Sequence, residues 1–172
     1  MAAYSNDNGT LRTIIGAYAN DNGTLRTIYA AATNDNGTLR IAYFDQISIS
    51  NETISNTNTD PTDSFAGYEL QSDGDIFRNT GIGGGAINTD IGDWITPKIN
   101  MAAYQCRATL NSGTTPVGTL NTWLALTSNR SWSLTRSTVG SVTCNLTVEI
   151  RRASDGVVLD SCTVILTAEV ES

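Results

Sequence analysis

The chain has 172 residues, of which 40% are hydrophobic and only 16% are charged, so it can bury one core and suits polar β-structure. Its 17 acidic residues outnumber 10 basic ones, and the resulting net charge of −7 disfavours nucleic-acid and anionic-membrane partners. No apolar run approaches the roughly 20 residues of a spanning helix and no secretion leader is recognisable, so we expect synthesis and retention in the cytosol until assembly or lysis.

The sequence Asn-Asp-Asn-Gly-Thr-Leu-Arg occurs three times, at 6–12, 20–26 and 34–40. Asn and Gly tolerate positive φ, so each copy predicts a β-hairpin turn, with its glycine at the tight position: Gly9, Gly23 and Gly37. The Thr-, Ile- and Tyr-rich segments between the turns predict strands that carry apolar residues on both faces. Covering both faces requires a stacked solenoid or several chains. We therefore expect residues 1–50 to form a repetitive β-stem of three 14-residue repeats, assembled as a homotrimer.

Calcium loops also place Asp or Asn at alternate positions before a Gly. Here each copy offers a single carboxylate, and no Glu closes the loop; the three carboxylates are Asp7, Asp21 and Asp35. A turn explains all four residues of each Asn-Asp-Asn-Gly stretch. We expect no metal ion, and a calcium titration of the melting temperature tests that expectation.

The composition changes after the repeats. Residues 45–63 are rich in Ser, Thr, Asn and Asp, and no apolar periodicity continues beyond Ile54, which predicts a linker over 51–63. Apolar and polar residues alternate again from Phe65 onward, interrupted by a Gly-, Asn- and Asp-rich segment, 79–93, that predicts a long loop. About seven short strands with one apolar face each predict an immunoglobulin-like antiparallel β-sandwich over 64–172. The expected fold class is all-β.

The two longest strands can be paired from their sequences. If residues 154–156 form a three-residue loop with Gly156 in the left-handed region, Cys144 faces Leu166 and the apolar residues of both strands share one face. A two-residue loop would mix the faces. We therefore predict the first register.

Three cysteines lie within alternating strand patterns: Cys106, Cys144 and Cys162. Three cannot form a closed disulfide set, no CxxC pair is present, and the chain has no histidine to complete a zinc site. We predict buried, reduced thiols that act as small hydrophobic side chains.

Catalytic patterns are weak. The glycine run 81–86 has no following Lys-Ser/Thr and opens no helix, so a phosphate cradle is not expected. Four acids in turns could be imagined as a glycosidase pair, but nothing in their surroundings predicts the burial that raises one pKa: Asp73, Asp75, Asp90 and Asp93. Without histidine or an activated Ser or Cys, we expect neither an enzyme nor a bound cofactor.

The tryptophans are expected to be core or rim aromatics, because each lies in or beside a regular strand: Trp94, Trp123 and Trp132. A carbohydrate-binding or adhesive module is the alternative function. It would be favoured if Trp94, Tyr68 or Tyr104 were exposed beside the polar segment 79–93.

Several spaced elements carry a resemblance to a known group of proteins. They are Gly-Asp-Trp-Ile-Thr-Pro at 92–97, Tyr-Gln-Cys-Arg-Ala-Thr at 104–109, Ser-Gly at 112–113, Gly-Thr-Leu-Asn-Thr-Trp-Leu-Ala-Leu at 118–126, Arg-Ser-Trp-Ser-Leu at 130–134 and Val-Glu-Ile-Arg-Arg-Ala-Ser-Asp-Gly-Val at 148–157. Residues 65–172 thereby resemble small β-sandwich domains in structural proteins of tailed bacteriophages, found on tail fibres, tail tips and capsid decorations. The resemblance implies a virion component, assembled in the host bacterial cytoplasm, with other virion proteins as partners and host surface polysaccharide as a further partner left open. It implies no catalytic residue.

Overall fold

The computed structural model describes residues 2–7, 10–15, 18–21, 24–27, 30–35, 38–43, 45–59, 62–82 and 85–172, with side chains from Asp45 onward. The described chain is all-β and contains one helical turn, the 3₁₀ helix η1 (Met101–Ala103). It divides into two compact units, residues 1–46 and 47–172. Among the described residues, no helix has the length and apolar character needed to cross a membrane.

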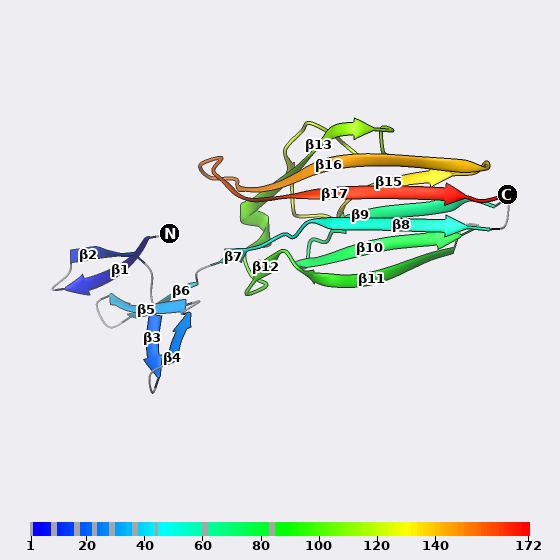
Figure 1. The fold of residues 1–172 in the computed structure, drawn as a ribbon. Helices are drawn as coiled ribbons and strands as arrows, with labels where there is room; N and C mark the ends of the chain where they lie inside the picture. The colour runs from blue at the N-terminus through cyan, green and yellow to red at the C-terminus, as the bar shows by residue number, and fades with distance from the viewer. Residues whose placement is uncertain are drawn as a thin grey trace. The chain divides into compact units, whose positions relative to one another are not determined.

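The first unit consists of three hairpins, one for each sequence repeat (Figure 1). They pair β1 (Ala2–Asp7) with β2 (Thr10–Ile15), β3 (Tyr18–Asp21) with β4 (Thr24–Thr27), and β5 (Ala30–Asp35) with β6 (Thr38–Tyr43). Each register places the Asp before the turn opposite the Thr after it, as in Asp7 opposite Thr10. The three turn glycines and the side chains of Asp7, Asp21 and Asp35 lie outside the described residues.

The second unit contains two larger sheets whose inner faces share one hydrophobic core. The antiparallel four-stranded sheet has the order β11-β10-β9-β15, from β9 (Ser64–Leu70), β10 (Asp75–Ile82), β11 (Gly85–Asp93) and β15 (Arg130–Arg136). The five-stranded sheet has the order β14-β13-β16-β17-β8, from β8 (Glu52–Asn58), β13 (Tyr104–Gly113), β14 (Leu124–Ala125), β16 (Gly140–Arg152) and β17 (Val158–Val170). A short pair, β7 (Gln46–Ile47) and β12 (Ile95–Thr96), lies beside them.

Strand β8 corrects two sequence predictions. The expected linker, 51–63, contains this strand, and β8 runs parallel to β17, so the five-stranded sheet is mixed and not purely antiparallel. Ile54 on β8 is 2% exposed and Asn58 is 3% exposed, so the strand belongs to the core although it carries one apolar side chain. Two of the core-facing positions of β8 are asparagines whose side chains are hydrogen-bonded: Asn56 donates to Ser64 and to the Gly81 carbonyl, and Asn58 donates to the Thr62 carbonyl. Because hydrogen-bonded amides occupy positions that apolar residues usually fill, composition indicated a linker.

The predicted loop over 79–93 is also wrong, since this segment forms most of the β10–β11 hairpin. Strand β11 forms one edge of its sheet, and most of its side chains are exposed on both faces. No apolar alternation is required of such a strand. The glycines and asparagines that indicated a loop are therefore compatible with a ribbon at the edge of the sheet.

The predicted register of the last hairpin is confirmed, with Cys144 opposite Leu166. Gly156 has φ 71°, as the prediction requires. The loop is one residue longer than predicted, because Arg152 donates its backbone N–H to the Val157 carbonyl at 3.0 Å. An irregularity after Ile150 absorbs the extra residue, so the core positions keep the predicted pairing.

Candidate functional site

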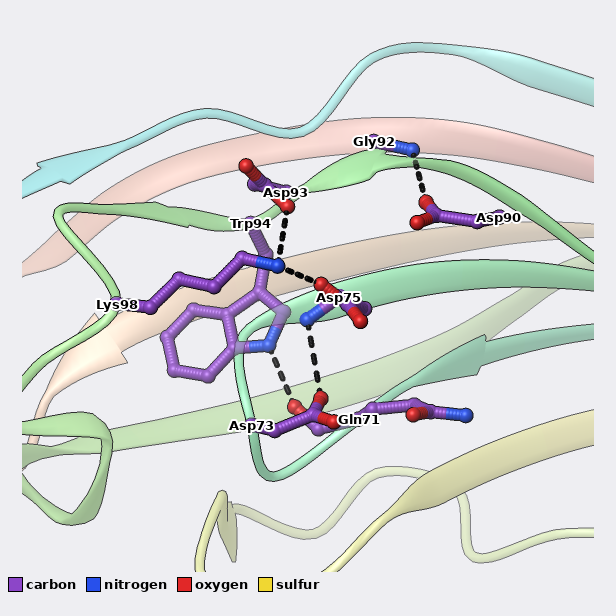
Figure 2. A network of polar contacts seen from close by, with 8 residues as sticks. All are labelled: Gln71, Asp73, Asp75, Asp90, Gly92, Asp93, Trp94 and Lys98. Carbon is purple, nitrogen blue, oxygen red and sulfur yellow. Dashed lines mark hydrogen bonds and ion pairs between the residues drawn. The ribbon is translucent and has the colours of Figure 1, made fainter.

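Two of the four turn carboxylates come together with a lysine at one end of the four-stranded sheet (Figure 2). Asp75 begins β10 and Asp93 ends β11, and the register places the two residues opposite each other. Carboxylates in that position repel one another. Lys98, which follows β12, donates from Nζ to Asp75 and to Asp93, where the Nζ–Oδ1 distance is 2.8 Å. The lysine therefore links the ends of two neighbouring strands.

We call this cluster of Lys98, Asp75 and Asp93 the Lys98 clamp, because the lysine binds both carboxylates. Hydrogen bonding to Asp75, and then to Asp93, raises the pKa of Lys98 well above its ordinary value, so the side chain is held as an ammonium ion. The Lys98 ammonium binds both carboxylates, whereas the two carboxyl groups of a glycosidase must be free to reach the substrate. Gly74 leaves room for this arrangement, because a Cβ there would lie only 3.0 Å from Lys98 Cγ.

The other two turn carboxylates bind the backbone. Asp73 accepts from the Asp75 N–H at 3.3 Å, and Asp90 accepts from the Gly92 N–H at 2.9 Å. Both bonds span two residues, as in Asx turns, which explains why Asp suits these positions. Figure 2 shows the two turns on either side of the Lys98 clamp.

Two of the three tryptophans are buried, as predicted. Trp94 is 0% exposed, donates from Nε1 to the Gln71 carbonyl at 2.7 Å, and packs edge-on against Tyr104 with ring centroids 6.0 Å apart. Trp132 is 1% exposed and donates to the Thr119 carbonyl at 2.8 Å. Tyr68 is buried as well. None of the three aromatics that would have favoured a carbohydrate site, Trp94, Tyr68 and Tyr104, is exposed beside 79–93.

Trp123 is partly exposed and forms a cluster that the sequence analysis missed. The Arg107 and Arg151 guanidinium carbons lie 4.5 Å and 4.2 Å from the Trp123 ring centroid. Arg107 also pairs with Glu149 at 2.6 Å, so the outer face of β13 and β16 is cross-linked by charge and by cation–π contact. The Arg107–Glu149 pair could have been predicted by pairing β13 with β16 in the same way as β16 with β17, since Arg107 lies opposite Glu149.

The three cysteines are buried and free, as predicted. Burial raises the pKa of Cys106 to about 12 and that of Cys162 to about 11, and it also raises the pKa of Cys144. Thiolate is the nucleophilic and metal-binding form of cysteine. These thiols therefore fill the core, and their raised pKa values disfavour the thiolate at neutral pH.

The outer face of the four-stranded sheet carries an open cavity of about 300 Å³. It is lined by Asp63, Phe65, Gly81, Gly85, Ala86 and Thr135. Within the part of the chain that the structure describes, no group of three or more Cys, Asp or Glu side chains is placed to bind a metal ion. No family model, curated protein or solved structure matches this chain.

Proposed function

We propose that this chain is a non-enzymatic virion structural protein of a tailed bacteriophage, which displays the second unit at the particle surface. The observation that carries the proposal is that carboxylates and thiols, which often act in catalysis, have structural contacts here. The carboxylates of Asp75 and Asp93 are clamped by Lys98, and the thiols are buried. A domain of this kind is suited to durable display, in a fibre, tail tip or decoration.

The second unit supports an immunoglobulin-like assignment in this proposal. Such sandwiches place strands B and E side by side in one sheet and C, F and G in the other. Here β9 lies beside β15, and β13, β16 and β17 are consecutive in the opposite sheet. The β10–β11 hairpin is then an addition beside β9, and β8 is the first strand, placed next to the last.

The three hairpins of residues 1–46 are proposed as the anchoring and assembly segment. Their shared register supports repetition at the level of backbone as well as sequence. Isolated two-stranded hairpins are marginal in water, so hairpins in series gain most from association with other copies. We propose a homotrimer, docked to other virion proteins and assembled in the host bacterial cytoplasm.

Binding of host polysaccharide is the second candidate function, and the open cavity on the four-stranded sheet favours it. Phe65 offers an aromatic surface there, while Asp63 and Thr135 offer polar groups that can bind sugar hydroxyls. Glycan-array binding by the wild type and by Phe65→Ala tests this role. Equal binding by both, or none by either, excludes the cavity.

The virion assignment is tested by electron microscopy of phage particles from the source of this chain, labelled with antibody raised against residues 47–172. We expect label at one type of surface position on intact particles. Antibody that reacts with the soluble fraction of the lysate but leaves particles unlabelled would overturn the assignment.

A further inference from the structure

The first and last long strands of the second unit run side by side in the same direction. Strand β8 pairs parallel with β17 along its whole length, from Glu52 beside Val164 to Asn58 beside Val170. Figure 1 shows both strands pointing toward the C-terminus, while the chain enters β8 from the opposite end. A pull on the chain ahead of β8 and a pull on the C-terminus therefore act in opposite directions along one shared axis.

The direction of a pull decides how such a pair resists it. In a parallel ladder the backbone hydrogen bonds are evenly spaced along the strands. Opposed pulls along the strand axis load all of these bonds together, so the two strands must slide past each other as a whole. A pull across the axis at one end of a pair loads the end bond first and opens the ladder one bond at a time.

Two side chains fasten the approach to β8 onto β17. The Asp160 carboxylate accepts from the Ile49 N–H at 2.8 Å, and Asn51 Oδ1 accepts from the Thr163 N–H at 2.8 Å. Ile49 and Asn51 both precede β8, on the side where a pull from the N-terminal direction arrives. These bonds therefore lengthen the segment that would have to slide.

The inner face of β8 also opposes sliding. Ile54 is 2% exposed, and Asn56 donates to Ser64 Oγ at 2.8 Å and to the Gly81 carbonyl at 2.7 Å. A shift of β8 by one residue would carry its inward side chains to the opposite face. Ile54 would then leave the core, and both bonds of Asn56 would break.

We propose that β8 and β17 form a tension-bearing pair, which carries a pull between the beginning of the second unit and its C-terminal end in shear. This unit begins at Ile47, so a pull on the first unit reaches it directly ahead of β8. Gly81, which lines the open cavity, is bonded to Asn56 toward the C-terminal end of β8. A ligand held in the cavity would load the pair in the same direction; this last point rests on the polysaccharide role proposed above, whereas the tension-bearing pair does not.

Single-molecule stretching of full-length protein tests the pair. Ser48→Cys with Ser172→Cys supplies two exposed thiols for handles that pull β8 against β17, and the native cysteines are buried. Val139→Cys with Ser172→Cys is the matched control. Val139 is 56% exposed and the adjacent Gly140 pairs with Val170, so these handles open one end of the β16–β17 pair. We expect the peak unfolding force to be roughly twofold higher, or more, with the handles at residues 48 and 172.

A substitution ahead of β8 separates resistance to shear from general stability. Asn51→Ala removes the acceptor of the Thr163 N–H, so it should lower the force in the shear geometry and leave the force in the control geometry unchanged. Asn111→Ala removes exposed side-chain bonds to Asn145 and Thr147, between β13 and β16, and should change neither force.

Equal forces in the two pulling geometries would overturn the proposal, as would an equal loss of force in both geometries from Asn51→Ala. The handles stretch the second unit alone, so the result does not depend on assembly through the repeats or on glycan binding.

Discussion

Gly156 donates its backbone N–H to the Arg152 carbonyl at 3.0 Å, while its own φ lies at 71°. This bond closes the loop between β16 and β17, the two longest strands. A Cβ at position 156 would approach only Arg151 Nη1, at 3.9 Å. A Cβ there therefore has room, and its addition is opposed by the backbone conformation and not by crowding.

Gly156→Val should destabilise the protein by roughly 1 kcal/mol or more, because a β-branched residue tolerates positive φ poorly. Chemical denaturation measures the change. Gly156→Asn is the control, since Asn adopts the left-handed region more readily and should cost less. Equal stability of the Val variant and the wild type would contradict the loop geometry.

The boundary of the second unit gives another prediction. Ile49 and Ile54 are 7% and 2% exposed, and full burial of an isoleucine contributes about 1.5–3 kcal/mol. Residues 47–172 alone should therefore melt cooperatively. A fragment of residues 60–172 lacks β8 and should be less stable by several kcal/mol. Calorimetry of both fragments compares them, and equal melting temperatures would show that β8 contributes little.

The Lys98 clamp should make a modest, salt-dependent contribution. Lys98→Met removes the ammonium and leaves Asp75 opposite Asp93, so we expect a loss of about 0.5–1 kcal/mol at low salt and a smaller loss at 1 M salt. Adding Asp75→Asn to Lys98→Met removes the repulsion and should recover part of the loss. A loss that is unchanged by salt would mean that the lysine acts through packing over Gly74.

The sequence allowed the pairing of β16 with β17 to be predicted because their apolar residues alternate over many positions. The register with Cys144 opposite Leu166 puts both sets of apolar residues on one face, whereas a slip by one residue would mix the faces. Strands β8 and β11 could not be found in the same way. Each lies at an edge, where few side chains are buried, so Ile54 and Ile91 are too isolated to produce a periodic signal.

The polar clusters were harder to predict than the core. Asp75, Asp93 and Lys98 come from three separate segments, and their meeting depends on the β10–β11 pairing that the sequence did not reveal. The Asx turns at Asp73 and Asp90 are local, and turn chemistry alone accounts for them. Long-range polar contacts therefore follow from register, and they become predictable only once every strand is assigned.

The buried thiols predict a loss of stability at alkaline pH. The folded-state pKa of Cys106 and that of Cys162 are raised from 9.0 to about 12 and about 11, so the unfolded chain releases these protons first. Their contribution is complete below pH 9 and is lost as pH rises through the folded-state values, by up to about 1.4 kcal/mol per pH unit for each thiol. Cys106→Val with Cys162→Val should flatten this alkaline decline in denaturation curves.

Thiol labelling provides the control for that prediction. At neutral pH all three cysteines should react slowly in native protein and readily after unfolding, because burial limits access and disfavours thiolate. Fast labelling of native Cys106, Cys144 or Cys162 would contradict both their burial and the expected alkaline behaviour.

Assembly through the repeats, with an independently folded second unit, is the central claim of the proposed function. Light scattering of full-length protein, of protein lacking residues 17–30, and of residues 47–172 tests it most directly. We predict a trimer-based mass for the full chain that weakens on loss of one repeat, and no such trimer for residues 47–172, while the second unit stays folded in all three. A full-length protein that is a stable monomer with residues 1–46 resistant to protease would contradict the claim.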